Sequence, residues 1–239
     1  MIGDSALGLA LFWLEGTSRG HVASAEELCP SRVLQPTEWP PTPVSTSCGG
    51  EPTVLYLMPG EVYRGQIVVG EGQKVVIKVG DGRGSATLEH FTSAPYEPVL
   101  RVLGSCVVEG DIRITHASPS VASNFAVGVG RDASLRIVGA TITSSTGSGV
   151  CVEGGTCDLD SVRIVDCKEH GLAIYQDIES SQGSVVSVRG GTEIAGCSGF
   201  GVQARGDDVR VSISQTASLK NNKLGRYSTQ LQGAEISEV

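Results

Sequence analysis

The chain has 239 residues, which suits one domain of ordinary size, or one domain with a short arm. Glycine is abundant, with 32 residues, whereas charged side chains make up only 18% of the chain, so a coiled coil or another long charged helix is excluded. The hydrophobic share of 40% is too high for a disordered chain, and no apolar run reaches the roughly 18 residues of a membrane-spanning helix. The net charge of −8 argues against nucleic-acid binding. We therefore expect a β-protein punctuated by glycine, with no nucleic-acid partner and no membrane span.

The first part of the chain, residues 1–52, differs in composition from the rest. It holds six of the ten prolines, so we expect an N-terminal arm with short helices and an extended, proline-rich segment. The arm also contains large apolar side chains. We interpret Phe12, Trp13, Leu14 and Trp39 as candidate partner-binding residues, because aromatic side chains often anchor protein interfaces.

The seven cysteines form no metal-binding pattern. No Cys-x-x-Cys pair occurs, and no cysteine lies near a histidine at ligand spacing, so we expect neither a zinc site nor any other cofactor. Their odd number leaves at least one thiol unpaired, and we interpret them as reduced core residues of a protein in a reducing compartment. No lysine or arginine precedes Arg19, unlike the basic start of a signal peptide. We therefore expect an intracellular location, cytoplasmic or cytoskeletal.

An internal repeat is present after residue 53, where the chain consists of short β-branched runs closed by glycine or aspartate. Residues 142–152, 164–174 and 194–204 align with one another, and a shorter copy follows near the C-terminus. In the three longer copies, a glycine that opens the next strand follows seven residues after the leading isoleucine. The leading apolar positions, 22 to 30 residues apart, are Ile114, Ile142, Ile164, Ile194 and Leu219.

This repeat predicts a solenoid in which each strand pairs in parallel with its counterpart one coil away. Equivalent side chains then stack along the axis. The alignment places Cys167 and Cys197 in one column, together with Ser145 and Asn221. The recurring glycine fits a corner where φ is positive, or where two backbones pack closely. We expect about six to seven coils, spaced by about 4.8 Å.

The pattern resembles the right-handed parallel β-helix of the pectin lyase-like superfamily. Residues 55–63, an apolar strand followed by Pro-Gly and then tyrosine, are similar to the common opening of this family, and residues 76–82 are similar to its next strand and glycine turn. The resemblance covers about residues 53–226 and implies an all-β solenoid; we assign residues 227–239 to a C-terminal tail. It implies little about activity, because the superfamily includes lyases, hydrolases, esterases and non-enzymatic scaffolds.

The sequence contains no complete catalytic set of the kind that enzymes of this superfamily use. The nearest matches to the motifs of a polygalacturonase-like hydrolase are the pair Asp207 and Asp208 and residues 169–171, which occur in reversed order. A pectate-lyase-like site needs a calcium-binding cluster of aspartates, but acidic residues do not align in adjacent coils. We interpret Asp207 and Asp208 as a solvated turn, and His170 as a corner residue.

The sequence thus favours a non-enzymatic structural or interaction subunit of a larger intracellular assembly. Such a subunit would bind partner proteins through the arm and through the ends of the solenoid, where strand edges need to be covered. The alternative is a polysaccharide-active enzyme or a carbohydrate-binding module of the pectin lyase-like type. That alternative predicts a loss of activity when Asp207 or Asp208 is changed.

Overall fold

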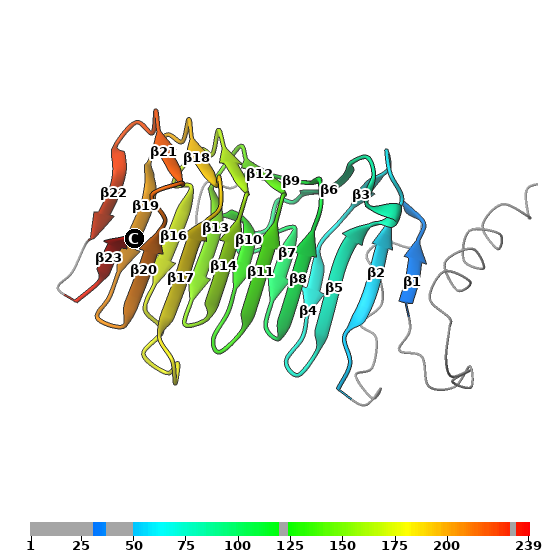
Figure 1. Ribbon diagram of the computed structural model, residues 1–239, viewed down its shortest axis with the longest axis horizontal. Coiled ribbons are helices and arrows are strands. Elements are labelled where there is room, and N and C mark those ends of the chain that lie inside the picture. The colour runs from blue at the N-terminus through cyan, green and yellow to red at the C-terminus, as the bar shows by residue number, and fades with distance from the viewer. Residues whose placement is uncertain (1–30, 37–49, 120–123, 230–232) are drawn as a thin grey trace, which may run out of the picture.

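The structure is a computed structural model that describes residues 31–36, 50–119, 124–229 and 233–239. These residues form a parallel β-solenoid of about seven coils, which confirms the predicted all-β fold. Each coil contributes one strand to each of three sheets, here named A, B and C. Successive coils advance along the long axis of the molecule, from blue to red in Figure 1. One short 3-10 helix, η2 (Gly80–Gly82), follows a strand of the second coil.

All neighbouring strands within the three sheets are parallel. In order along the axis, sheet A contains β1 (Ser31–Leu34), β2 (Thr53–Leu57), β5 (Lys74–Val79), β8 (Ser105–Glu109), β11 (Ser134–Val138), β14 (Thr156–Asp160), β17 (Ser184–Arg189), β20 (Val209–Ile213) and β23 (Glu235–Glu238). Sheet B contains β3 (Val62–Arg64), β6 (Ala86–Phe91), β9 (Ile112–Ala117), β12 (Thr141–Ser144), β15 (Arg163–Val165), β18 (Glu193–Ala195) and β21 (Ser218–Lys220). Sheet C contains β4 (Ile67–Val69), β7 (Leu100–Val102), β10 (Phe125–Val129), β13 (Ser148–Glu153), β16 (Leu172–Tyr175), β19 (Phe200–Arg205) and β22 (Gly225–Thr229).

The register of sheet B confirms the repeat that the sequence predicts. Ile142 pairs with Ile114 of the preceding coil and with Ile164 of the following coil. Ile164 in turn pairs with Ile194, and Ile194 pairs with Leu219. The five leading apolar positions therefore form one continuous column along the solenoid.

The hydrophobic core fills the inside of the coils. Strand residues alternate between this interior and the outer faces, as the two-residue period of a β-strand requires, and most inward positions are aliphatic. The isoleucine column continues towards the N-terminus through Leu88 and Tyr63, which are both fully buried. Because each coil covers the one before it, apolar side chains are removed from water along the whole axis, at about 25 cal/mol of stabilisation per Å² buried.

One predicted column is displaced by one residue at both ends. Ser144 and Asn222 stack with Cys167 and Cys197, whereas the prediction named Ser145 and Asn221. The later coils contain an extra residue with a left-handed backbone just before the column position, for example Asp166, with φ of 54°. The coil of Ser144 lacks this residue, so counting three residues from the leading isoleucine gives Ser145 in place of Ser144. The same count from Leu219 gives Asn222; Asn221, which was predicted, is the left-handed residue before the column position.

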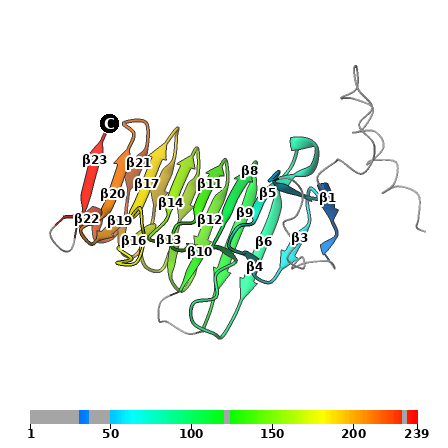
Figure 2. The same ribbon diagram turned by 90° about the horizontal axis from the view of Figure 1, so that it is seen from below.

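The sheets extend beyond the boundaries predicted for the solenoid. Strand β1, from the part assigned to the arm, pairs with β2, and strands β22 and β23 include residues assigned to the tail. Figure 2 shows β1 and β23 at opposite ends of the axis. Within the described ranges, no helix has the length and apolar character needed to cross a membrane.

Candidate functional site

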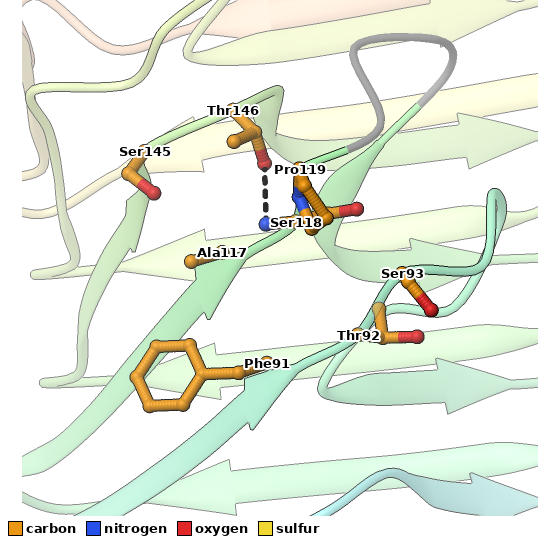
Figure 3. Close-up of a pocket in the computed structure, with 8 residues that line it drawn as sticks. All are labelled: Phe91, Thr92, Ser93, Ala117, Ser118, Pro119, Ser145 and Thr146. Carbon is orange, nitrogen blue, oxygen red and sulfur yellow. Dashed lines mark hydrogen bonds between the residues drawn. The ribbon is translucent and has the colours of Figure 1, made fainter.

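The first candidate site is an open hollow where sheet B turns into sheet C in three successive coils. Its volume is about 480 Å³. The side chains that line it, drawn in Figure 3, are Phe91, Thr92, Ser93, Ala117, Ser118, Pro119, Ser145 and Thr146. Phe91 is 62% exposed, and most of the other lining residues have hydroxyl groups. The hollow thus combines an aromatic face with several hydrogen-bonding groups.

Hydrogen bonds fix the rim of this hollow. The backbone N–H of Ser118 donates to Oγ1 of Thr146 at 3.1 Å, which links two neighbouring coils (Figure 3). Oγ1 of Thr92 donates to a carboxylate oxygen of Glu97 and accepts from the backbone N–H of Ala94 at 3.1 Å. The hydrogen bond from Thr92 lowers the pKa of Glu97, so that carboxylate stays ionised at neutral pH. The rim is therefore formed before any ligand binds.

A buried serine–histidine pair lies in the column next to the hollow. Nδ1 of His116 is 3.2 Å from Oγ of Ser144, and burial lowers the pKa of His116. Such a pair can act as nucleophile and base in an enzyme. Here both side chains are fully buried, so a substrate cannot reach the hydroxyl group. Oγ of Ser144 also accepts a hydrogen bond from the backbone N–H of Gly147 at 3.1 Å, so the pair stabilises the corner.

The second candidate site is the outer face of sheet C. Gly128, Cys151, Ala173 and Gln203 are successive register partners at the centre of this face. All four are buried although they face outward. The ring of Phe125 covers Gly128, where an added Cβ would lie 2.5 Å from Cε2 of that ring. The row therefore consists of small residues in three coils, Gly128, Cys151 and Ala173, followed by the longer side chain of Gln203.

Ionisable groups gather around Cys151 on this face. Its Sγ is 3.9 Å from Oε1 of Glu153, which pairs in register with Tyr175. Burial and the negative charges of Glu153 and Glu169 raise the pKa of the Cys151 thiol well above its usual value. Burial also raises the pKa of Tyr175 to about 12. Both groups stay protonated near pH 7, and a thiol that resists ionisation is a poor nucleophile. The chemistry of this cluster suits binding better than covalent catalysis.

The third candidate site is the C-terminal end of the solenoid. Strands β21, β22 and β23 end their sheets, so in the described part of the chain their outer edges face no further strand. Three exposed apolar side chains lie at this end: Leu224, Tyr227 and Val239. Arg226 from sheet C and Glu238 from sheet A form an ion pair, with Nη2 and Oε1 2.8 Å apart. An unpaired sheet edge beside exposed apolar groups is a surface on which another protein chain can add.

The structure describes some of the residues that the sequence predicts to be functional, and others lie outside the described ranges. Phe12, Trp13, Leu14 and Trp39 lie outside the described residues, so their role as partner contacts stays a prediction. Asp207 and Asp208 are exposed in the short turn between β19 and β20. Across residues 31–36, 50–119, 124–229 and 233–239, no group of three or more His, Cys, Asp or Glu side chains is placed to hold a metal ion.

His170 contacts Phe200 of the next coil at a corner of the solenoid. Its Nδ1 accepts a hydrogen bond from the backbone N–H of Phe200 at 3.0 Å, and the two rings stack with their centroids 5.9 Å apart. Burial lowers the pKa of His170, which agrees with its role as an acceptor.

The sequence alone does not reveal the hollow around Phe91 or the cluster around Cys151 on sheet C. The hollow joins Phe91 to Thr146 across three coils, and its residues share no motif, so only the register could bring them together. Cys151 and Glu153 are two residues apart, which places them on the same side of a strand. That spacing was a usable signal for the second site, but it does not show which side faces outward.

Comparison with models of protein families finds no match. Comparisons with curated proteins and with solved structures find no match either.

Proposed function

We propose that the protein is a non-enzymatic interaction subunit of a larger intracellular assembly, and that it binds a partner protein at the C-terminal end of its solenoid. The observation that carries this proposal is the set of open edges of β21, β22 and β23 beside exposed Leu224, Tyr227 and Val239. An added strand would form main-chain hydrogen bonds with such an edge, and it would cover the apolar side chains. The predicted contacts of Phe12, Trp13, Leu14 and Trp39 in the arm are part of the same proposal.

The chemistry of the thiols supports the non-enzymatic and intracellular parts of this proposal. Cys151, the thiol on the outer face of sheet C, has a raised pKa and carboxylate neighbours, which is the opposite of an activated nucleophile. The five cysteines within the described part of the chain are free and buried: Cys106, Cys151, Cys157, Cys167 and Cys197. Free thiols in this number are typical of a reducing compartment, cytoplasmic or cytoskeletal in our proposal.

We also propose that the chain belongs to the non-catalytic branch of the pectin lyase-like superfamily. The arrangement of three parallel sheets around one core supports this assignment, together with the family-like opening in residues 55–63. Fold alone does not assign an activity, because the same solenoid serves both enzymes and scaffolds.

Gradient sedimentation of a cell lysate prepared under mild conditions tests the proposal. Mass spectrometry then identifies the proteins that migrate together with the chain. The wild-type chain should sediment with a larger particle. A double variant, Leu224→Ser with Tyr227→Ser, should shift towards the position of the free chain, because both side chains are exposed and their loss leaves the core intact. Val68→Ser, an exposed aliphatic side chain in the first coil, is the matched control and should sediment like the wild type. Wild-type protein that sediments alone would rule out the proposed assembly.

A second candidate function, carbohydrate binding, is favoured by the hollow around Phe91. An exposed aromatic ring can stack on a sugar ring, and the hydroxyl groups of Thr92 and Ser118 can form hydrogen bonds with it. A bound oligosaccharide would raise the melting temperature by mass action. Uronic-acid oligomers should therefore stabilise the wild type and Tyr227→Ala, but not Phe91→Ala. No shift for the wild type across the oligomer series would exclude this function.

A further inference from the structure

The loop between β16 and β17 differs from the corresponding turns of its neighbours. It spans residues 176–183, whereas the coil before it turns at residues 154–155 and the coil after it at 206–208. In Figure 1 it is the yellow loop that projects at the lower edge of the solenoid. Ile178, near its start, is 88% exposed, the highest value for a large hydrophobic side chain in the described part of the chain.

A single arginine from another coil holds both neighbours of Ile178. Nε of Arg131 is 2.8 Å from Oδ2 of Asp177, and Nη1 of Arg131 is 2.6 Å from Oε2 of Glu179. The backbone N–H of Glu179 also donates to Oδ1 of Asp177 at 3.0 Å. These contacts on both sides restrain the backbone at Ile178, while its side chain stays exposed to solvent.

The next turn of the loop is held by the residue after that arginine. Oδ1 of Asp132 accepts hydrogen bonds from the backbone N–H and from Oγ of Ser181, at 3.2 and 2.8 Å. Oγ of Ser180 donates to the backbone carbonyl of Gly154 at 2.7 Å, which ties the loop to the turn that lies between. The hydrogen bonds from Ser181 lower the pKa of Asp132, and Arg131 lowers the pKa of Asp177. The loop thus stays latched at neutral pH.

The contacts of Arg131 and Asp132 with residues 177–181, here called the latch, are not explained by stability alone. These contacts order an eight-residue loop at an entropic cost, yet they leave Ile178 88% exposed. In an interface, however, a side chain that is already held in place loses little further freedom when it binds. The charges around Ile178 are unbalanced. Asp177 and Glu179 both pair with the guanidinium group of Arg131, and Asp132, whose carboxylate holds Ser181, adds a third negative charge beside them.

We propose that the loop 176–183 is a docking element, and that Ile178 inserts into an apolar socket, bordered by lysine or arginine side chains, on a partner protein. The basic border follows from the excess of carboxylates around Ile178. The same excess disfavours an anionic membrane as the binding surface. This inference rests on the proposed function only in assuming that the chain acts by binding protein; the surface is separate from the C-terminal end.

Photo-crosslinking in cells that naturally express the chain is the first test. A photo-reactive phenylalanine analogue is placed at position 178, at position 68 as a control, or at position 227 in the C-terminal end. The inference predicts a protein adduct at 178 that is absent at 68. If 227 forms an adduct and 178 does not, the loop inference is overturned while the proposed function stands. If neither position forms an adduct, both are overturned.

Affinity measurements with the purified partner are the decisive test. Ile178→Ser should weaken binding at least tenfold, whereas Val68→Ser should leave the dissociation constant unchanged. Arg131→Ala keeps Ile178 but removes the two ion pairs to Asp177 and Glu179, so it should weaken binding several-fold and speed hydrogen exchange in residues 176–183. Binding to the wild type should also weaken with added salt. Equal affinities of Ile178→Ser and the wild type would overturn the inference. Binding of the wild type to phosphatidylcholine vesicles that is lost in Ile178→Ser would also overturn it, because Ile178 would then contact lipid.

Discussion

Gly171 approaches the next coil so closely that a Cβ on it would lie 2.2 Å from Cγ2 of Ile194. Gly149 repeats the relationship one coil earlier, where a Cβ would lie 2.4 Å from Cγ2 of Ile164. Neither glycine has a positive φ. Close packing of the coils, and not a left-handed backbone, therefore explains the repeated glycine.

Replacing this glycine by alanine tests that explanation. Gly171→Ala should lower the free energy of unfolding by about 1–3 kcal/mol, because the new methyl group overlaps a fully packed core. Urea unfolding measures the effect. Gly191→Ala is the matched control, since a Cβ there meets no atom within 4 Å and the backbone is not left-handed. A loss no larger for Gly171→Ala than for Gly191→Ala would contradict the close-packing explanation.

Burial should make Cys106 and Cys157 unreactive in the folded protein. Burial raises the pKa of Cys106 to about 12, and burial raises the pKa of Cys157 to about 12 as well. At pH 7.5 very little thiolate forms, and the side chains are inaccessible to reagents. Iodoacetamide labelling, resolved by peptide mass spectrometry, should be slow for both in the native chain and fast in urea. Native labelling at the rate seen in urea would show that the coils open readily.

Acid should weaken the fold through His116. Burial lowers its pKa in the folded protein, so the unfolded chain, with a histidine pKa near 6.5, binds the proton more strongly. Stability from this residue is therefore present above about pH 6.5 and is lost as the pH falls below that value. His116→Asn should flatten the dependence of unfolding free energy on pH between 6.5 and 5. An unchanged slope would mean that other groups, such as His170, dominate this range.

The sequence predicts the solenoid well because the same types of residue recur at equivalent positions of successive coils. The leading isoleucines, such as Ile142 and Ile164, stack in the structure as they align in the sequence, since each must fill the same interior position. The corner beyond them was predicted one residue out at Ser145, because the coils differ there by one left-handed residue that simple counting does not reveal. The hollow at Phe91 and the latched loop around Ile178 depend on contacts between coils whose turns share no pattern. Sequence periodicity carries no information about them.

The left-handed residue at that corner gives the last prediction. Asp166 has a φ of 54°, and the equivalent residues of the next two coils, Gly196 and Asn221, have φ of 71° and 57°. Glycine, asparagine and aspartate are the residues that tolerate this backbone best, whereas a β-branched side chain is strained there by about 1–2 kcal/mol. Asp166→Asn should therefore leave the free energy of unfolding nearly unchanged, and Asp166→Val should lower it by about that amount. Lys168→Val, at a neighbouring exposed position without a positive φ, is the control for adding valine to this corner. If both valine variants lose the same stability in urea unfolding, the backbone conformation is not what selects the residue at this position.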